Sequence, residues 1–164
     1  MFPTFVLASV EPKMLGNVTQ QLKTLDGITW FAPLTGRFDL VLQLKVTDHK
    51  QIYELVNRVR SIRGVVATST YIPFEGFTNG KKIEASDSLA LVLLRAKEQV
   101  PRVLQTLKQL PHIYGAFVVP GEFDILATLY GKNYEEIVSQ VLKVAEIEGI
   151  RTSETLFAYK PQWA

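Results

Sequence analysis

The sequence predicts an α+β protein built from two copies of one βαββαβ unit, with the sheets of the two copies packed on each other. Gly36–Leu40 and Gly121–Ile125 have the same pattern of a glycine, an aromatic residue, an aspartate and an apolar residue, 85 residues apart. The same shift aligns apolar and turn residues without a gap from Val18 to Thr70. A spacing shared over so long a stretch indicates a tandem duplication.

Within each copy, the apolar residues change between a period of two, typical of strands, and a helical period. Pro12 and Pro101 suit the first turn of a helix, and Asp48 and Asn133 are typical N-caps. In the first copy the expected elements are strands Thr4–Val10, Ile28–Leu34, Phe38–Val46 and Val65–Ile72, a helix from Pro12 to Leu25 and another from Asp48 to Val59. This order is the split βαβ or ferredoxin-like arrangement.

The second copy repeats this order, beginning with a strand at Leu89–Arg95 and ending with one at Ile150–Tyr159. Between the copies, Pro73–Ser88 has neither helical nor strand periodicity and is expected to be a linker. The expected domains are residues 1–72 and 89–160, with a linker at 73–88 and a tail at 161–164.

The first strands of the two copies are apolar on both faces, as in Phe5–Val10 and Leu89–Leu94. A solitary sheet of this kind has helices on one face, and its other face alternates apolar with polar residues. Because 47% of the residues are hydrophobic, a further apolar surface has to be covered. The sequence therefore predicts that the sheet of one repeat packs on the sheet of the other.

Composition narrows the class of protein. The net charge is +2 and the basic residues are scattered, so we expect no direct binding of nucleic acid. The chain has no cysteine, which excludes disulfides and thiol catalysis and fits a reducing compartment. It shows neither a convincing signal peptide nor an apolar run of about 20 residues. We expect a cytoplasmic protein without membrane contact, and no metal or cofactor.

The repeated motifs resemble the effector-binding (RAM) domain of the Lrp/AsnC regulators. That family has a βαββαβ unit, a Gly-x-aromatic-Asp-hydrophobic motif at the third strand, and a last strand that starts with glycine and contains threonine. Gly36–Leu40 is followed by Gly64–Thr70, and Gly121–Ile125 is followed by Gly149–Thr155. The resemblance covers nearly the whole chain outside the linker and tail.

This resemblance implies a dimeric α+β barrel type of fold, assembly into homo-oligomers, and small effectors such as amino acids as ligands. It also implies other Lrp/AsnC-type regulators as candidate partners. One departure is large: only three residues precede the first expected strand, which leaves no room for a helix-turn-helix. We therefore expect no DNA binding by this chain alone.

The candidate ligand-binding residues lie at the turns and in the last strands. Asp39 and Asp124 would bind an ammonium group, or they would only accept backbone N–H bonds and fix the hairpin. Strand propensity also explains the hydroxyl residues, and turn geometry explains the glycines. The full set is Gly36, Phe38, Asp39, Thr68, Thr70, Gly121, Phe123, Asp124, Ser153 and Thr155.

Three classes of function remain from the sequence. The first is an effector-binding regulatory module of Lrp/AsnC type without its own DNA-binding domain. The second is a scaffold that assembles with full-length regulators. The third is an enzyme related to dimeric α+β barrel enzymes. Because no nucleophile–base pair, metal cluster or cofactor loop is recognisable, and His49 and His112 lie at unrelated repeat positions, we expect no catalytic residues and no enzymatic activity.

Overall fold

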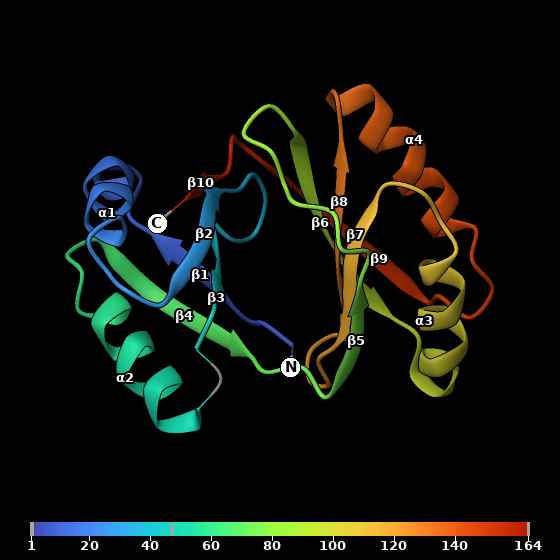
Figure 1. The fold of residues 1–164 in the computed structure, drawn as a ribbon, viewed down its shortest axis with the longest axis horizontal. Coiled ribbons are helices and arrows are strands. Elements are labelled where there is room, and N and C mark those ends of the chain that lie inside the picture. Colours follow the sequence, from blue (N-terminus) through green and yellow to red (C-terminus); the bar gives the residue numbers. More distant parts are fainter. Residues whose placement is uncertain (1, 47, 164) are drawn as a thin grey trace. The chain divides into compact units, whose positions relative to one another are not determined.

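The computed structural model describes residues 2–46 and 48–163 and divides the chain into two compact units. The first unit contains residues 3–72 and the C-terminal segment from Pro161; the second contains Pro73–Lys160 together with Phe2. Each unit has one antiparallel five-stranded sheet and two α-helices (Figure 1). The predicted α+β class with two ferredoxin-like halves is confirmed.

The first unit has the strand order β10-β2-β3-β1-β4. Its helices are both amphipathic, with Val18 and Leu22 of α1 and Ile52, Leu55 and Val59 of α2 buried against one face of the sheet. The elements are β1 (Thr4–Val10), the 3-10 helix η1 (Pro12–Met14), α1 (Leu15–Leu22), β2 (Ile28–Pro33), β3 (Leu40–Leu44), α2 (His49–Arg60), β4 (Val65–Tyr71) and β10 (Gln162–Trp163).

The second unit has the corresponding order β5-β7-β8-β6-β9. Its core has the same composition of strand and helix residues, with Val103 and Leu107 of α3 and Val144 of α4 in it. The elements are β5 (Glu75–Thr78), β6 (Ser88–Arg95), the 3-10 helix η2 (Lys97–Gln99), α3 (Val100–Lys108), β7 (Ile113–Val118), β8 (Ile125–Gly131), α4 (Tyr134–Ala145) and β9 (Thr152–Ala158).

The two expected N-caps are confirmed. The side chain of Asp48 accepts a hydrogen bond from the backbone N–H of Gln51 at 3.1 Å, and that of Asn133 accepts one from Glu136 at 2.9 Å. The expected strand Phe38–Val46 is shorter in the structure, because β3 spans only Leu40–Leu44. The last strand is also shorter, since β9 begins at Thr152 and ends at Ala158.

The expectation that Pro73–Ser88 contains no strand is wrong. Glu75–Thr78 forms β5 and pairs antiparallel with β7. The four residues carry no period-two pattern because close backbone approach, and not an apolar face, determines them. A Cβ on Gly76 would lie 2.6 Å from the carbonyl oxygen of Ala116, and a Cβ on Gly115 would lie 2.9 Å from that of Phe77.

The tail also forms a strand, in which Gln162 pairs with Phe31 and Trp163 with Trp30. β5 follows the last strand of the first repeat but joins the sheet of the second unit, and β10 follows the last strand of the second repeat but joins the sheet of the first. Each sheet is therefore completed by the segment that follows the other repeat in sequence. The domain boundaries at residues 72 and 89 stay a prediction.

Strand register shows that the repeat is not uniform. Leu44 and Leu129, which are 85 residues apart, pair with Thr4 and Ala90, which are 86 apart. The shift of 85 therefore holds from the first helix onward, and one residue is added before it. Both faces of the first strands are buried, as Phe5 and Val6 show. The packing of one sheet on the other stays a prediction.

Candidate functional site

The two repeated motifs tie together the same three strands in each unit. In the first unit, the N–H of Asp39 donates to the carbonyl of Ala8 at 2.9 Å, and the carbonyl of Asp39 accepts from Leu34 at 2.8 Å. In the second unit, Asp124 donates to Leu94 at 2.8 Å and accepts from Val119 at 2.9 Å. These aspartates therefore fix the start of the third strand of each repeat against the two earlier strands.

The aspartate side chains make further hydrogen bonds to the backbone. Oδ2 of Asp39 accepts from the N–H of Val10 at 2.8 Å. Oδ2 of Asp124 accepts from two N–H groups, those of Ala96 at 2.8 Å and Lys97 at 3.2 Å. Both carboxylates thus hold the end of the first strand of their repeat, which is the structural role that their position near a turn favours.

The glycines of the motifs have the backbone conformation that turns require. Gly36 has φ of 119° and Gly121 has φ of 156°, which L side chains rarely adopt. The aromatic residues that follow, Phe38 and Phe123, are buried with exposed fractions of 9% and 4%. These four residues shape the turns, and neither phenylalanine is accessible to a ligand.

The hydroxyl residues do not meet the carboxylates. Thr68 lies opposite Ala8, and Ala8 lies opposite Leu40, the neighbour of Asp39. Strands are about 4.8 Å apart, so the backbones of Thr68 and Asp39 are roughly two strand spacings apart. Thr70 lies two residues farther along β4.

In the second unit the arrangement is the same. Ser153 lies opposite Leu94, which lies opposite Ile125, the neighbour of Asp124. Thr155 lies two residues farther along β9. The ten predicted residues therefore form two separate groups in each unit, one around the turn and one on the edge strand.

A hollow of about 350 Å³ lies next to Asp124, beside the two backbone groups that its carboxylate binds. It lies where β6 ends and α3 begins, and the turn before β9 forms its other side. Its lining residues are Ala96, Lys97, Glu98, Gln99, Arg102, Glu148, Gly149, Ile150 and Arg151. This volume lies within the range of about 300–1,000 Å³ typical of small-molecule sites.

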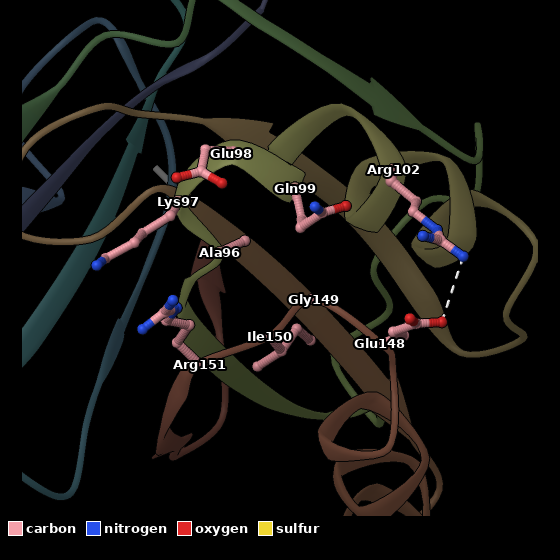
Figure 2. Close-up of a pocket in the computed structure, with 9 residues that line it drawn as sticks. All are labelled: Ala96, Lys97, Glu98, Gln99, Arg102, Glu148, Gly149, Ile150 and Arg151. Carbon is pink, nitrogen blue, oxygen red and sulfur yellow. Dashed lines mark hydrogen bonds and ion pairs between the residues drawn. The ribbon is translucent and has the colours of Figure 1, made fainter.

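Charged side chains from both segments surround this hollow (Figure 2). Lys97 and Arg151 lie at one end, and Arg102 and Glu148 lie at the other, joined by an ion pair of 3.2 Å. The pair is open to solvent, with 63% of the Arg102 and 81% of the Glu148 side chain exposed. Three basic groups face two acidic ones, so the hollow favours an anionic group of a ligand, with interactions screened by water.

A close backbone approach shapes the floor of the hollow. Gly149 has φ of 102°, and a Cβ there would lie 2.7 Å from Cβ of Gln99. This glycine lets the turn before β9 pass close to the start of α3. The basic residues of the hollow were not among the sequence candidates. Comparing the repeats could have found them, because Lys97, Arg102 and Arg151 correspond to Pro12, Asn17 and Val66.

Other chemistry is limited in the part of the chain that the structure describes. Residues 2–46 and 48–163 contain no group of three or more His, Asp or Glu side chains that could hold a metal ion. Among these residues the longest helices, α2 and α4, have 12 residues each, and no helix is long and apolar enough to cross a membrane. Burial raises the pKa of the Tyr114 hydroxyl above its usual value, but this residue does not line the hollow.

Comparisons with solved structures give the fold of the whole chain. The siroheme decarboxylase NirDL is 10% identical with a TM-score of 0.71, covering 98% of this chain and 72% of its own. Its complex with an iron-uroporphyrin III analogue gives a TM-score of 0.70 with the same identity and coverage. A mutant chlorite dismutase from Candidatus Nitrospira defluvii is 9% identical with a TM-score of 0.64, covering 96% of this chain and 90% of its own.

These comparisons correct one expectation. The sequence predicted no enzymatic activity because no catalytic constellation was recognisable in it. Proteins named as a decarboxylase and a dismutase share the fold over nearly the whole chain, so the lack of a recognisable motif gives no ground for that exclusion. The likeness at 9–10% identity is one of fold, and fold alone does not assign a reaction.

No curated protein matches the chain. The family model described as the Lrp/AsnC ligand binding domain matches twice, at residues 4–82 and 89–161. These two segments include both copies of the glycine–aspartate motif and both edge strands, as the resemblance implied. The chain therefore belongs to the Lrp/AsnC ligand-binding domain family.

Proposed function

We propose that this chain is an effector-binding regulatory module whose ligand is an amino acid or a related small carboxylic acid. The observation that supports this proposal most directly is the hollow beside Asp124, in a chain with two matches to the Lrp/AsnC ligand binding domain. The hollow combines basic side chains with acidic ones in a volume that suits a small zwitterion.

In the proposed complex, Arg102 and Arg151 bind the ligand's carboxylate, because a guanidinium can donate two parallel hydrogen bonds to it. Glu98, on the rim of the hollow, accepts from the ligand's ammonium group. Asp124 acts as a positioning residue, since its carboxylate holds the backbone of Ala96 and Lys97. The residues around Asp39 are proposed to have the equivalent positioning role in the first unit.

Isothermal titration of the full chain with the twenty amino acids and their 2-oxo acids tests this proposal. Arg151→Gln should weaken binding about three- to tenfold, because one exposed charged contact contributes roughly 1 kcal/mol. Arg63→Gln is the matched control, because Arg63 occupies the position of Glu148 in the other repeat and its loss changes the total charge equally. If Arg151→Gln binds the ligand as tightly as the parent, the hollow is not the site.

A role as an assembly partner is compatible with effector binding. We propose that other Lrp/AsnC-type regulators are candidate partners of this chain, because it contains their ligand-binding domain twice. Co-purification of the chain with a purified full-length regulator, with and without effector, tests this interaction. If the two proteins elute separately under both conditions, the chain acts without such a partner.

A second candidate function is tetrapyrrole binding with enzymatic activity. It is favoured by the likeness in fold to the siroheme decarboxylase in complex with an iron-uroporphyrin III analogue, over 98% of this chain. An absorbance titration of the chain with iron-uroporphyrin III distinguishes this candidate from the first. A saturable spectral change at equimolar protein would support tetrapyrrole binding, whereas an unchanged spectrum would leave the amino acid proposal as the better one.

A further inference from the structure

Helix α4 has two apolar faces. Ile137 and Val144 are buried in the core of the second unit. Three other large apolar side chains stay exposed, at 48% for Tyr134, 43% for Val138 and 61% for Leu142. They are spaced at i, i+4 and i+8, so they lie along one side of the helix. We call these three residues the α4 stripe.

The equivalent helix of the first repeat has a different surface. The residues of α2 that correspond to the α4 stripe are His49, Tyr53 and Asn57. Tyr53 is 68% exposed and is the apolar member of this set. The two helices therefore offer different exposed faces, although both have 12 residues and bury the opposite side in the same way.

The two faces also differ in charge. The α4 stripe is accompanied by Glu135, Glu136 and Glu146 and by one basic residue, Lys143. Helix α2 carries Lys50, Arg58 and Arg60 and one acidic residue, Glu54, with Asp48 as its N-cap. The two faces are thus of opposite charge, which favours pairing of α4 with α2 over pairing of either helix with its own copy.

The order of the charges indicates the direction of this pairing. In an antiparallel pair, Glu135 and Glu136 at the start of α4 meet Arg58 and Arg60 at the end of α2. At the other end of the pair, Glu146 meets Lys50 and Lys143 meets Asp48. Tyr53 then lies at the middle of the α4 stripe, because it corresponds to Val138 in the repeat.

We propose that α4 of one chain docks antiparallel on α2 of a second copy of the same chain. The contact is heterologous, so each chain offers one α4 and one α2 and can bind two neighbours. One pair of short helices buries less than the roughly 1,200–2,000 Å² of a standard stable interface. The assembly therefore depends on protein concentration and weakens with salt.

Sedimentation of the full chain at about 100 µM, where weak contacts of small area form, tests this proposal with two variants. Leu142→Glu disables the α4 stripe and Tyr53→Glu disables the face on α2. Both residues are well exposed, so both variants should fold, as circular dichroism can verify. The wild type should assemble, and each variant alone should be monomeric, because every contact needs one intact face of each kind.

Mixing the two variants gives the sharpest result. The intact α4 of the Tyr53→Glu chain can bind the intact α2 of the Leu142→Glu chain, and no further contact is possible. The mixture should therefore form a 1:1 dimer and nothing larger. Gln109→Glu, which adds the same charge at an exposed residue outside α2 and α4, is the matched control and should assemble like the wild type.

Two outcomes would overturn the proposal. A wild-type chain that stays monomeric at this concentration has no such contact. A Tyr53→Glu variant that assembles like the wild type would show that α4 does not pair with α2. The result is independent of effector binding, because none of the residues changed here lines the hollow.

Discussion

The two repeats share a scaffold but differ where one of them has a hollow. In both, the aspartate of the motif fixes the end of the first strand by hydrogen bonds to backbone N–H groups. At the position of Arg102, the first repeat has Asn17, whose Nδ2 donates to the carbonyl of Arg63 at 3.3 Å. Met14, which corresponds to Gln99, packs on the core of the first unit. The duplication has therefore kept the scaffold and changed the surface beside it.

The cores of the two repeats differ as well. Leu55 of α2 is buried in the first unit, and its counterpart Gln140 on α4 is buried with an exposed fraction of 6%. Among the described residues, Oε1 of Gln140 has no hydrogen-bond partner. A buried acceptor of this kind costs about 1–3 kcal/mol. The second repeat therefore carries a stability penalty that the first does not.

Exchanging these two residues should give the largest effect. Leu55→Gln should destabilise the protein by about 2–4 kcal/mol, because it removes apolar burial and places a polar group in the core. Gln140→Leu should stabilise it by about 1–2 kcal/mol. Urea unfolding followed by circular dichroism measures both. A destabilising effect of Gln140→Leu would mean that its amide makes an interaction through water.

The motif aspartates should give the next largest effect. Asp124→Ala removes two hydrogen bonds to backbone N–H groups and Asp39→Ala removes one. Bonds to a charged acceptor contribute about 1.5–3 kcal/mol, so Asp124→Ala should destabilise more than Asp39→Ala. Asp26→Ala, at an exposed aspartate, is the control in the same urea experiment. Equal losses for all three variants would show that charge alone is responsible.

A smaller effect should follow from the turn before the second strand of each repeat. Gly27 has φ of 97°, and its counterpart His112 has φ of 65°, which is a rare conformation for a residue with a side chain. A Cβ on Gly27 would lie 2.9 Å from Cδ2 of Leu55. Gly27→Ala should therefore destabilise by about 1–2 kcal/mol.

His112→Gly should change stability by less than about 1 kcal/mol. It relieves the strained backbone but loses the contact with Tyr130, whose ring centroid is 5.6 Å away. It also loses the approach of Nδ1 to Glu136 at 3.0 Å. This approach counts as an ion pair when the imidazole is protonated, although Nδ1 has no hydrogen-bond partner among the described residues. Thermal unfolding of both variants measures the difference. A loss for His112→Gly as large as that for Gly27→Ala would show that the side-chain contacts outweigh the strain.

Periodicity and turn chemistry were enough to predict the order of the main strands and helices. Both N-caps, Asp48 and Asn133, were also predicted, because a cap depends on local sequence. β5 was not predicted, since its place is determined by the close approach of Gly76 to β7 across 40 residues of chain. A local pattern contains no record of that partner.

The predictability of the candidate site follows the same division. The motif aspartates were recognisable because they repeat, and the alternative of a backbone-fixing role was visible from the turn beside them. Arg102 and Arg151 were missed because they lie 49 residues apart and meet only through the fold. Their signal was a difference between the repeats, whereas the search began from what the repeats share.

The smallest expected effect concerns the ion pair at the hollow. Glu148→Gln removes the partner of Arg102, but both side chains are mostly exposed, and such pairs contribute about 0–1 kcal/mol. Stability should therefore stay within roughly 0.5 kcal/mol of the parent. Affinity for an anionic effector should rise about two- to fivefold, because Arg102 is released and one negative charge leaves the site. Lys13→Gln, on the equivalent segment of the first repeat, should change neither quantity. Titration at two salt concentrations measures the affinity, and the gain should shrink as salt rises. Weaker binding by Glu148→Gln would instead show that this carboxylate contacts the ligand's ammonium group.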